Sequence, residues 1–225
     1  MTTYYNINPR FYVSVDCIIF GFDKGSLKLL LLKRNFEPAK GSWSLMGGFV
    51  QDGESVDDAA KRVLAELTGL ENVYMEQVGT FGEVDRDPGE RVISVAYYAL
   101  ININEYDRNL VQQHNAHWAE INEIPPLVFD HSQMVNQARI MLQKKASSEP
   151  IGFNLLPSMF TLFQLQSLYE AIYGEPFDKR NFRKRVADVN YIEKTDKIDK
   201  TGSKRGAALY KFNENAYRKA PKFKL

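Results

Sequence analysis

The sequence predicts an α+β protein of two domains, and three observations support that fold class. Apolar runs with strand spacing flank an amphipathic helix over residues 11–145. The small, polar segment 146–150 ends in proline and interrupts this pattern, so we place the boundary there and expect domains at 1–148 and 149–225. Beyond the boundary, two helical segments precede two strand-like segments, which is the order of a helix–turn–helix with a β-hairpin wing.

The first domain is expected to combine a β-hairpin, three further strands and two helices. A glycine-containing turn joins its first two strands. Ser55 is placed to cap the first helix with Asp58 three residues on, and Gly69 is placed to end it. The expected strands are 11–22, 27–34, 74–81, 91–101 and a short one at 117–121, and the last helix is 130–145, with Ile140 and Leu142 among its apolar positions.

The second domain carries its own helix signals. Thr161 and Gln164 form a capping-box pair at the start of a helix that Gly174 ends after Tyr173. A second helix is expected to run from Asp178 to about Asp188. Two short strands, 191–194 and 207–212, are expected to follow, joined by a polar loop with Gly202 at its tip.

Composition excludes several classes of protein. No apolar run among the 225 residues approaches the ~20 residues of a membrane span. The first ten residues lack the charged-then-apolar pattern of a signal peptide, so we expect none. The single cysteine, Cys17, excludes an intramolecular disulfide and lies in an apolar stretch, so we expect a buried, inert thiol. We therefore expect a cytoplasmic protein without a cofactor.

Charge is distributed unevenly although the formal net charge is only +1. Residues 1–145 hold 14 basic and 19 acidic residues, whereas residues 178–225 hold 15 basic and 6 acidic ones. An acidic body with a basic C-terminal region indicates contact with nucleic acid or a membrane surface. A basic surface that is merely solvated remains the alternative on charge alone.

Residues 48–70 carry a spaced pattern of glycines and charged residues. The pattern resembles the Nudix box, G-x5-E-x7-R-E-U-x-E-E-x-G-U, in which U is apolar. The matching positions are Gly48, Glu54, Arg62, Leu64, Glu66, Gly69 and Leu70. The preceding strand-and-loop, 43–50, also resembles the family's approach to the box. The resemblance implies a Nudix-like α/β/α sandwich with a mixed sheet over roughly residues 10–145.

Two positions depart from the box, and they bear on function. Nudix hydrolases bind divalent cations through three helix glutamates, but here those positions are Val63, Glu66 and Leu67. A small dication needs several charged oxygen ligands, and two of the three are apolar here. We therefore expect no catalytic residues, no metal site and no hydrolase activity, with Glu54 and Arg62 pairing to brace the loop against the helix.

A domain that keeps its scaffold without its metal ligands is expected to bind a small effector instead. The expected contacts combine cations, an aromatic ring and the charged loop 82–90, because loops often carry specificity. They are Lys33, Trp43, Glu66, Asp85, Arg86 and Arg91. Three alternatives remain open. Trp43 equally suits the core, Glu66 equally suits a solvent-exposed helix position, and the charged loop equally suits a solvated surface.

The second helix of the C-terminal domain has one apolar and one cationic face. Phe182, Val186 and Val189 share the apolar face. Arginine, lysine and asparagine on the other face suit contacts with phosphates and base edges in a major groove, and the basic loop suits a wing. The expected DNA contacts are Lys179, Arg180, Asn181, Arg183 and Lys184 on the helix, and Lys204 and Arg205 in the loop.

The whole chain is similar to the Nudix-related transcriptional regulators, which join a Nudix-like sensor to a winged helix-turn-helix. The stretches that carry this resemblance are PPLVFDHSQMV (125–135), FTLFQLQSLYEAIYG (160–174), DKRNFRKRV (178–186) and GAALYKF (206–212). It implies a ligand-responsive repressor that binds a double-stranded DNA operator as a homodimer.

The missing acidic ligands favour, in our interpretation, the branch of these regulators that senses a sugar such as L-arabinose and controls sugar catabolism. Three alternatives stay open. The first is a regulator of NAD metabolism that senses ADP-ribose. The others are an active Nudix hydrolase with a nucleic-acid-binding appendage, and a basic adaptor without DNA specificity.

Overall fold

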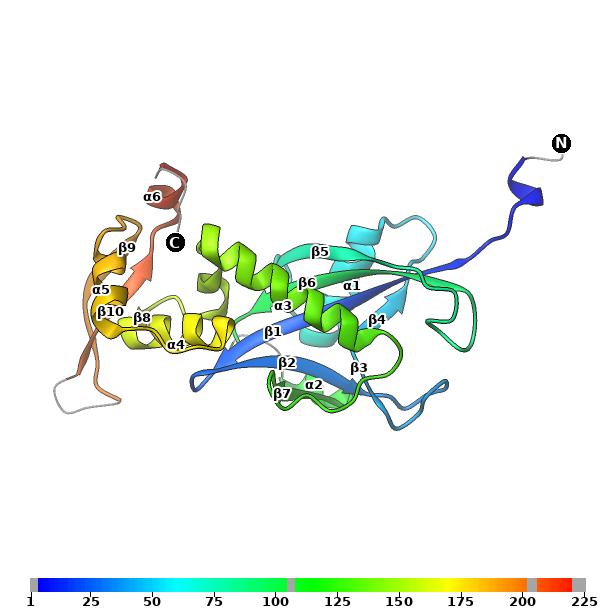
Figure 1. Ribbon diagram of the computed structural model, residues 1–225, viewed down its shortest axis with the longest axis horizontal. Helices are drawn as coiled ribbons and strands as arrows, with labels where there is room; N and C mark the ends of the chain where they lie inside the picture. The colour runs from blue at the N-terminus through cyan, green and yellow to red at the C-terminus, as the bar shows by residue number, and fades with distance from the viewer. Residues whose placement is uncertain (1–3, 105–107, 202–205, 220–225) are drawn as a thin grey trace.

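The computed structural model describes residues 4–104, 108–201 and 206–219. The α/β sandwich and the smaller C-terminal domain lie at different ends of an elongated molecule, with the N-terminus at the end away from the C-terminal domain (Figure 1). Within the described ranges, no helix is long and apolar enough to cross a membrane.

A seven-stranded sheet forms the centre of the first domain. Its order is β3-β2-β1-β6-β5, with β4 paired to β1 and β7 paired to β2. The strands are β1 (Tyr12–Asp23), β2 (Ser26–Lys33), β3 (Trp43–Ser44), β4 (Met46–Phe49), β5 (Tyr74–Phe81), β6 (Val92–Ile101) and β7 (Ala116–Glu120). Because β1 and β6 are parallel while the other pairs are antiparallel, the sheet is mixed, as predicted.

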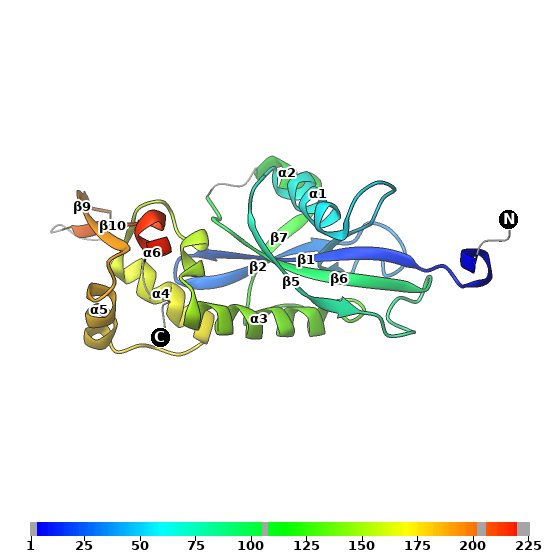
Figure 2. The same ribbon diagram turned by 90° about the horizontal axis from the view of Figure 1, so that it is seen from above.

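Helices cover both faces of this sheet, which confirms the predicted sandwich (Figure 2). Helices α1 (Val56–Thr68) and α2 (Arg108–Gln113) lie on one face, and α3 (His131–Ser148) lies on the other. Successive strand residues point to opposite faces. Cys17 of β1 therefore packs in the apolar cluster that includes α1, whereas its neighbour Ile18 packs in the cluster that includes α3.

The predicted ends of α1 are confirmed by its hydrogen bonds. The Ser55 hydroxyl accepts the backbone N–H of Asp58 at 3.1 Å, and Gly69 ends the helix with a φ of 71°. Cys17 is fully buried beneath this helix, and burial raises the pKa of its thiol. The thiol is therefore protonated and unreactive, as expected.

The C-terminal domain is built on a three-stranded antiparallel sheet in the order β8-β10-β9. Its elements are the 3-10 helix η2 (Ile151–Leu155), β8 (Phe160–Thr161), α4 (Leu162–Tyr173), α5 (Lys179–Ala187), β9 (Ile192–Asp199), β10 (Ala207–Phe212) and α6 (Glu214–Lys219). The Thr161–Gln164 capping box and the Gly174 helix end are both present. Helix, turn, helix and hairpin follow one another as predicted.

The structure departs from the sequence predictions in element lengths and in several short elements. Strand β9 continues to Asp199, because that residue still pairs with Ala207 across the wing. Helix α3 continues to Ser148. Ile140 is 64% exposed, so it does not belong to the helix's apolar face, whereas Leu142 is buried. The strand-and-loop expected over 43–50 consists of two short strands, β3 and β4, and the unpredicted elements are the 3-10 helix η1 (Tyr4–Ile7), α2, η2, β8 and α6.

One apolar cluster continues from the sandwich into the C-terminal domain. It joins strand residues such as Phe20 and Leu29 to Leu142 of α3 and to Leu165 and Leu168 of α4. The two domains therefore share buried apolar surface, which couples the position of α4 to that of α3.

Candidate effector and DNA-binding sites

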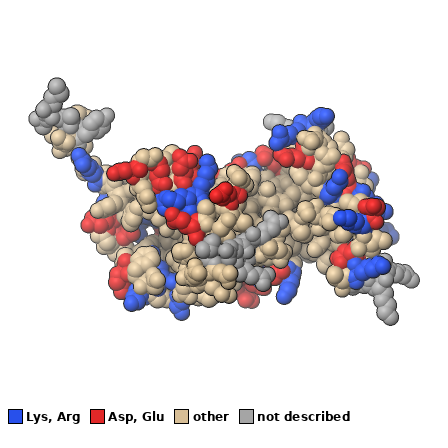
Figure 3. All heavy atoms as spheres, turned by 180° about the vertical axis from the view of Figure 1, so that it is seen from behind, with Lys and Arg blue, Asp and Glu red and all other residues tan. Residues whose placement is uncertain are grey.

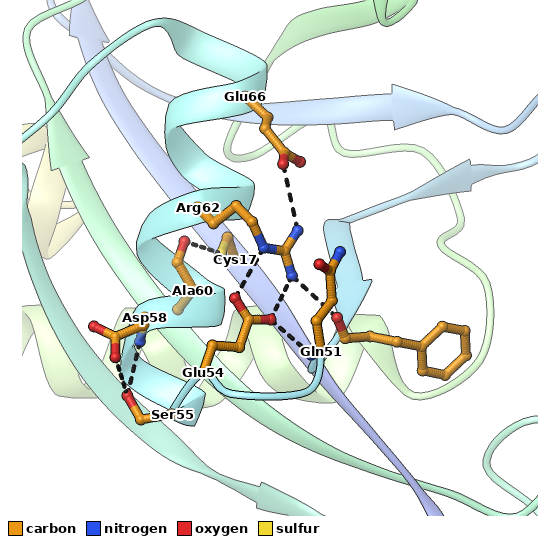
Figure 4. Close-up of polar contacts among 9 residues, drawn as sticks. Cys17, Gln51, Glu54, Ser55, Asp58, Ala60, Arg62 and Glu66 are labelled. Atoms are coloured by element: carbon orange, nitrogen blue, oxygen red, sulfur yellow. Dashed lines mark hydrogen bonds and ion pairs between the residues drawn. The ribbon is translucent and has the colours of Figure 1, made fainter.

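Glu54 and Arg62 form the brace predicted for the box (Figure 4). Arg62 donates to both carboxylate oxygens of Glu54, at 3.0 and 2.7 Å, and to the carbonyl of Phe49 at 3.1 Å. The hydrogen bond from Arg62 is the main cause that lowers the pKa of Glu54, followed by the backbone N–H of Gln51. Arg62 thus fixes the loop after β4 to the middle of α1.

The residues at the three metal-binding positions of the box do not fit a divalent cation. Val63 is 3% exposed and Leu67 is 8% exposed, and both pack in the apolar cluster beneath α1. Glu66 faces outward and lies 3.4 Å from Arg62. Among the described residues, no group of three or more His, Cys, Asp or Glu is placed to hold a metal. A hard cation would find one carboxylate here, already paired with an arginine.

A buried polar network lies on the opposite face of the sheet, and Arg86 is at its centre. The guanidinium of Arg86, 3% exposed, makes two hydrogen bonds to Asp130, at 2.9 and 2.8 Å. It also lies 3.6 Å from Asp16, whose other neighbours are the hydroxyl of Ser94 at 2.6 Å and the ring of His131 at 3.6 Å. The network joins β1, β6, loop 82–91 and the start of α3.

Burial and charge compete within this network. Burial alone would lower the pKa of Arg86, but its hydrogen bonds to Asp130 and the nearby carboxylates outweigh burial and raise that pKa. For His131, burial dominates and lowers the pKa, so the ring is held neutral. In that form its Nδ1 accepts the backbone N–H of Leu45 at 3.0 Å, which ties α3 to the strand entering the box.

Cations and aromatic rings gather beside this network, near the ends of β2 and β3. Lys33 lies over the Trp43 ring at 5.6 Å, because β2 and β3 pair these two residues. Next to them, the guanidinium of Arg34 lies 4.2 Å from the ring of Phe36 and 5.4 Å from that of Phe129. Phe129 has a φ of 53°, which is unusual for an aromatic residue and indicates local strain.

The structure does not bring the six predicted effector residues into one group. Lys33, Trp43 and Arg86 lie on the α3 side of the sheet, whereas Glu66 projects from α1 on the other side. Arg86 is buried and paired with Asp130, and this pairing holds loop 82–91 against the start of α3. Asp85 is exposed, and Arg91 donates to the carbonyls of Glu83 and Gly82, which shapes the same loop.

Sequence reasoning missed Asp16, Asp130 and His131 as network members. A signal for Asp16 was present, because it is a carboxylate within the apolar run VSVDCIIF. Asp130 and His131 lie in the stretch PPLVFDHSQMV, which was recognised only as similar to the family. Nothing in the spacing indicated that all three would meet Arg86, since 70 residues separate Arg86 from Asp16.

Helix α5 presents the cationic face that the sequence predicted. Phe182, Val186 and Val189 are half-buried against the domain. The predicted helix contacts Lys179, Arg180, Asn181, Arg183 and Lys184 are all exposed. Among the described residues, none of the four cations in that set forms an ion pair. The face therefore offers uncompensated positive charge to an anionic partner.

The wing lies beside this helix and adds Lys194 and Lys197 on β9. Lys and Arg side chains lie on the surface at the end of the molecule that carries the C-terminal domain (Figure 3). The two predicted wing contacts, Lys204 and Arg205, lie outside the described residues.

Comparison with known proteins identifies both halves of the chain. Residues 10–139 match the model of the NUDIX domain, and residues 152–212 match that of the NrtR DNA-binding winged helix domain. The ADPR-responsive transcriptional repressor NtrR of Acinetobacter baylyi is 36% identical over 208 residues, which are 91% of this chain and 83% of that protein. The chain belongs to the NrtR family.

Members and relatives of the NrtR family include both regulators and an enzyme. Shewanella oneidensis NrtR in complex with a 27mer DNA superposes with a TM-score of 0.82 at 30% identity, covering 94% of this chain and 97% of that one. The NUDIX domain of the same protein, in complex with ADP ribose, has a TM-score of 0.51 at 29% identity and covers 63% of this chain and 94% of that one. The ADP-ribose pyrophosphatase of Methanocaldococcus jannaschii is 32% identical over 126 residues, 56% of this chain and 74% of that enzyme.

Proposed function

We propose that the protein is an ADP-ribose-responsive transcriptional repressor. The observation that carries this proposal is the joining of an exposed cationic recognition helix to a Nudix domain whose cation-binding positions, Val63 and Leu67, are apolar and buried. The relatives' names and complexes support ADP-ribose as the effector and DNA as the partner. Nothing in the comparisons supports the sugar that we expected from the missing acidic ligands.

The DNA contact in this proposal is made by α5 and the wing. Arg180, Asn181 and Arg183 are exposed on α5, and arginine and asparagine can form paired hydrogen bonds with guanine and adenine in the major groove. The lysines of β9 suit phosphates. We extend the proposal to a homodimer, because two recognition helices can then read two half-sites one DNA turn apart.

The effector site in this proposal lies on the α3 side of the first domain. Lys33 and Arg34 offer cations to a diphosphate, and Trp43 and Phe129 offer rings on which an adenine can stack. Arg86 supports this site because its hydrogen bonds to Asp130 hold loop 82–91 in place. Arg91 shapes the loop, and Asp85 remains a candidate at its rim, whereas Glu66 is too far around the domain to join it.

The decisive experiment is a binding assay on the full chain. A duplex is first selected by the protein from a random pool, and its binding is then followed by fluorescence anisotropy with and without ADP-ribose. We expect salt-sensitive binding that prefers the selected duplex and weakens as ADP-ribose is added. Equal affinity for selected and random duplexes would contradict the repressor proposal. Weakening of duplex binding by arabinose and not by ADP-ribose would contradict ADP-ribose as the effector.

A hydrolase remains the second candidate, because the relative from Methanocaldococcus jannaschii is an ADP-ribose pyrophosphatase. Its test is release of AMP and ribose phosphate from ADP-ribose in the presence of Mg²⁺. We expect no release above the uncatalysed rate, since Glu66 is the one carboxylate left at the three helix positions. Metal-dependent turnover that disappears in Glu66→Gln would favour the enzyme instead.

A further inference from the structure

We propose that α3 is the element that couples the effector domain to the recognition helix, and that Asp130 is its switch. The inference rests on the proposed function and adds the regulation of the same protein. Helix α3 spans 18 residues, or about 27 Å. Its first residues belong to the Arg86 network, and its later turns contact α4.

Asp130 has two possible partners, and this makes the start of α3 bistable. It occupies the N-cap position of α3, where an aspartate side chain commonly accepts a backbone N–H of the first turn. Here it makes no such bond, and its carboxylate instead binds Arg86 with both oxygens. A change in loop 82–91 that withdraws Arg86 frees the carboxylate, which can cap α3 when the Asp130 backbone, now at φ −94° and ψ 12°, becomes extended. Loop position and helix start are therefore linked.

The far part of α3 is joined to α4 by a reciprocal pair of hydrogen bonds. The side chain of Gln143 donates to the carbonyl of Ile172 at 2.9 Å, and the hydroxyl of Tyr173 donates to the carbonyl of Gln143 at 3.1 Å. Both bonds hold the last turn of α4, which leads directly into the turn before α5. A shift of α3 is therefore transmitted to that turn.

Aromatic contacts continue the connection to the recognition helix. Phe177 in the turn lies 5.8 Å from Tyr173 and 6.2 Å from Phe182 of α5, measured between ring centroids. Its backbone is fixed by Glu170 at 2.9 Å and by Gln166 at 3.1 Å. The turn thus moves with α4 rather than independently.

Helix α5 has room to respond, because it borders a hollow and its apolar residues Phe182 and Val186 are only partly buried against the core. The hollow has a volume of about 450 Å³, and no residue of α5 is fully buried. Its lining includes Tyr169, Tyr173, Phe177, Phe182, Val186 and Val189. A small movement of α4 can be accepted there without creating clashes, so the cationic face is displaced relative to the groove that it reads.

Hydrogen exchange of the free full-length protein tests the coupling without any ligand or DNA. Asp130→Asn is compared in the wild-type and Tyr173→Phe backgrounds, and the amides of α5 are followed. We expect Asp130→Asn alone to change α5 exchange by about 5-fold or more. In the Tyr173→Phe background we expect a smaller change, below about 2-fold, because that variant removes one of the two hydrogen bonds that join α3 to α4. Unchanged α5 exchange, or equal factors in the two backgrounds, would overturn the proposal.

Matched variants separate coupling from general loosening. Asp85→Asn alters an exposed carboxylate of the same loop, and Tyr97→Phe removes a hydroxyl that bonds Asp57 on the α1 side of the sheet. Neither is expected to alter α5 exchange, and an equal effect from either would overturn the proposal. Gln143→Met removes the donor to the Ile172 carbonyl, so it must affect α5 exchange as Tyr173→Phe does. If Asp130→Asn does not unfold cooperatively, Arg86→Lys takes its place in the comparison.

ADP-ribose then separates this proposal from the proposed function. If the wild-type protein keeps its selected duplex at saturating ADP-ribose, the effector proposal fails while the exchange result still decides the role of α3. If the wild type releases the duplex, Tyr173→Phe should bind ADP-ribose in a thermal-shift assay yet keep the duplex. Release by Tyr173→Phe at the wild-type ADP-ribose concentration would overturn the coupling.

Discussion

Replacing Arg86 by methionine tests whether the buried network holds the first domain together. Methionine keeps most of the side chain's length but removes the charge. The change leaves Asp16 and Asp130 without their cation, although their side chains are only 10% and 12% exposed. Asp16 keeps the hydroxyl of Ser94, whereas Asp130 loses both of its 2.8–2.9 Å bonds.

The expected cost follows from that uncompensated charge. Breaking a buried ion pair by removing one partner costs about 3–5 kcal/mol. For a chain of this length each kcal/mol lowers the melting temperature by about 2–4 °C, so Arg86→Met should lower it by about 6–20 °C. Differential scanning calorimetry at one fixed protein concentration measures this shift, and urea unfolding measures the free energy directly.

Arg91→Met provides the matched control for Arg86→Met. Arg91 lies in the same loop but is only half-buried, and it donates to two backbone carbonyls rather than to carboxylates. Its replacement should cost about 1 kcal/mol, or about 2–4 °C. Equal losses in the two variants would refute the reasoning, because they would show that the buried charges at Asp16 and Asp130 carry no special cost.

Three further outcomes are expected. Arg183→Ala should weaken binding to the selected duplex by about 1–3 kcal/mol in fluorescence anisotropy and leave the ADP-ribose thermal shift unchanged, whereas Lys61→Ala on α1 should do neither. Burial lowers the pKa of His131 below 6.5, so the stability due to its neutral ring is complete above that pH and is lost as the pH falls below it. Urea unfolding from pH 7 to 5 should therefore show that the free energy of unfolding falls more steeply in the wild type than in His131→Gln, by up to about 1.4 kcal/mol per pH unit. Parallel plots of unfolding free energy against pH would contradict this. Leu168→Ala should cost about 2–5 kcal/mol, because Leu168 is fully buried at the domain junction, whereas Phe163→Ala, at a residue 69% exposed, should cost under about 0.5 kcal/mol.

Local sequence signals predicted most elements because their causes are local. The Ser55 and Thr161 caps, the glycine ends of α1 and α4 and the apolar spacing of α5 each depend on residues within one or two turns. Strand β8 was missed for the opposite reason. It is two residues long and exists because β10 pairs with it.

The effector residues show where such reasoning stops. The sequence indicated that loop 82–90 is charged and that Arg86 is one of its cations. It gave no means to distinguish a buried arginine that organises the loop from an exposed one that contacts a ligand. Whether Arg86 is buried or exposed depends on Asp130 and Asp16, which lie 44 and 70 residues away in the sequence. They reach Arg86 only when β1 and α3 pack against the same loop.

The sequence by itself determined that the chain joins a Nudix-like domain to a winged helix, that Val63 and Leu67 stand where the Nudix pattern has glutamate, and that α5 is cationic. These are properties of residue type and short spacing. Only the tertiary structure decided that Val63 and Leu67 are buried in the core, that Arg86 pairs with Asp130, and that Gln143 and Tyr173 join α3 to α4. Complete burial, buried charge pairs and contacts between helices depend on which distant segments pack together, and local spacing indicates only which face of a helix is apolar.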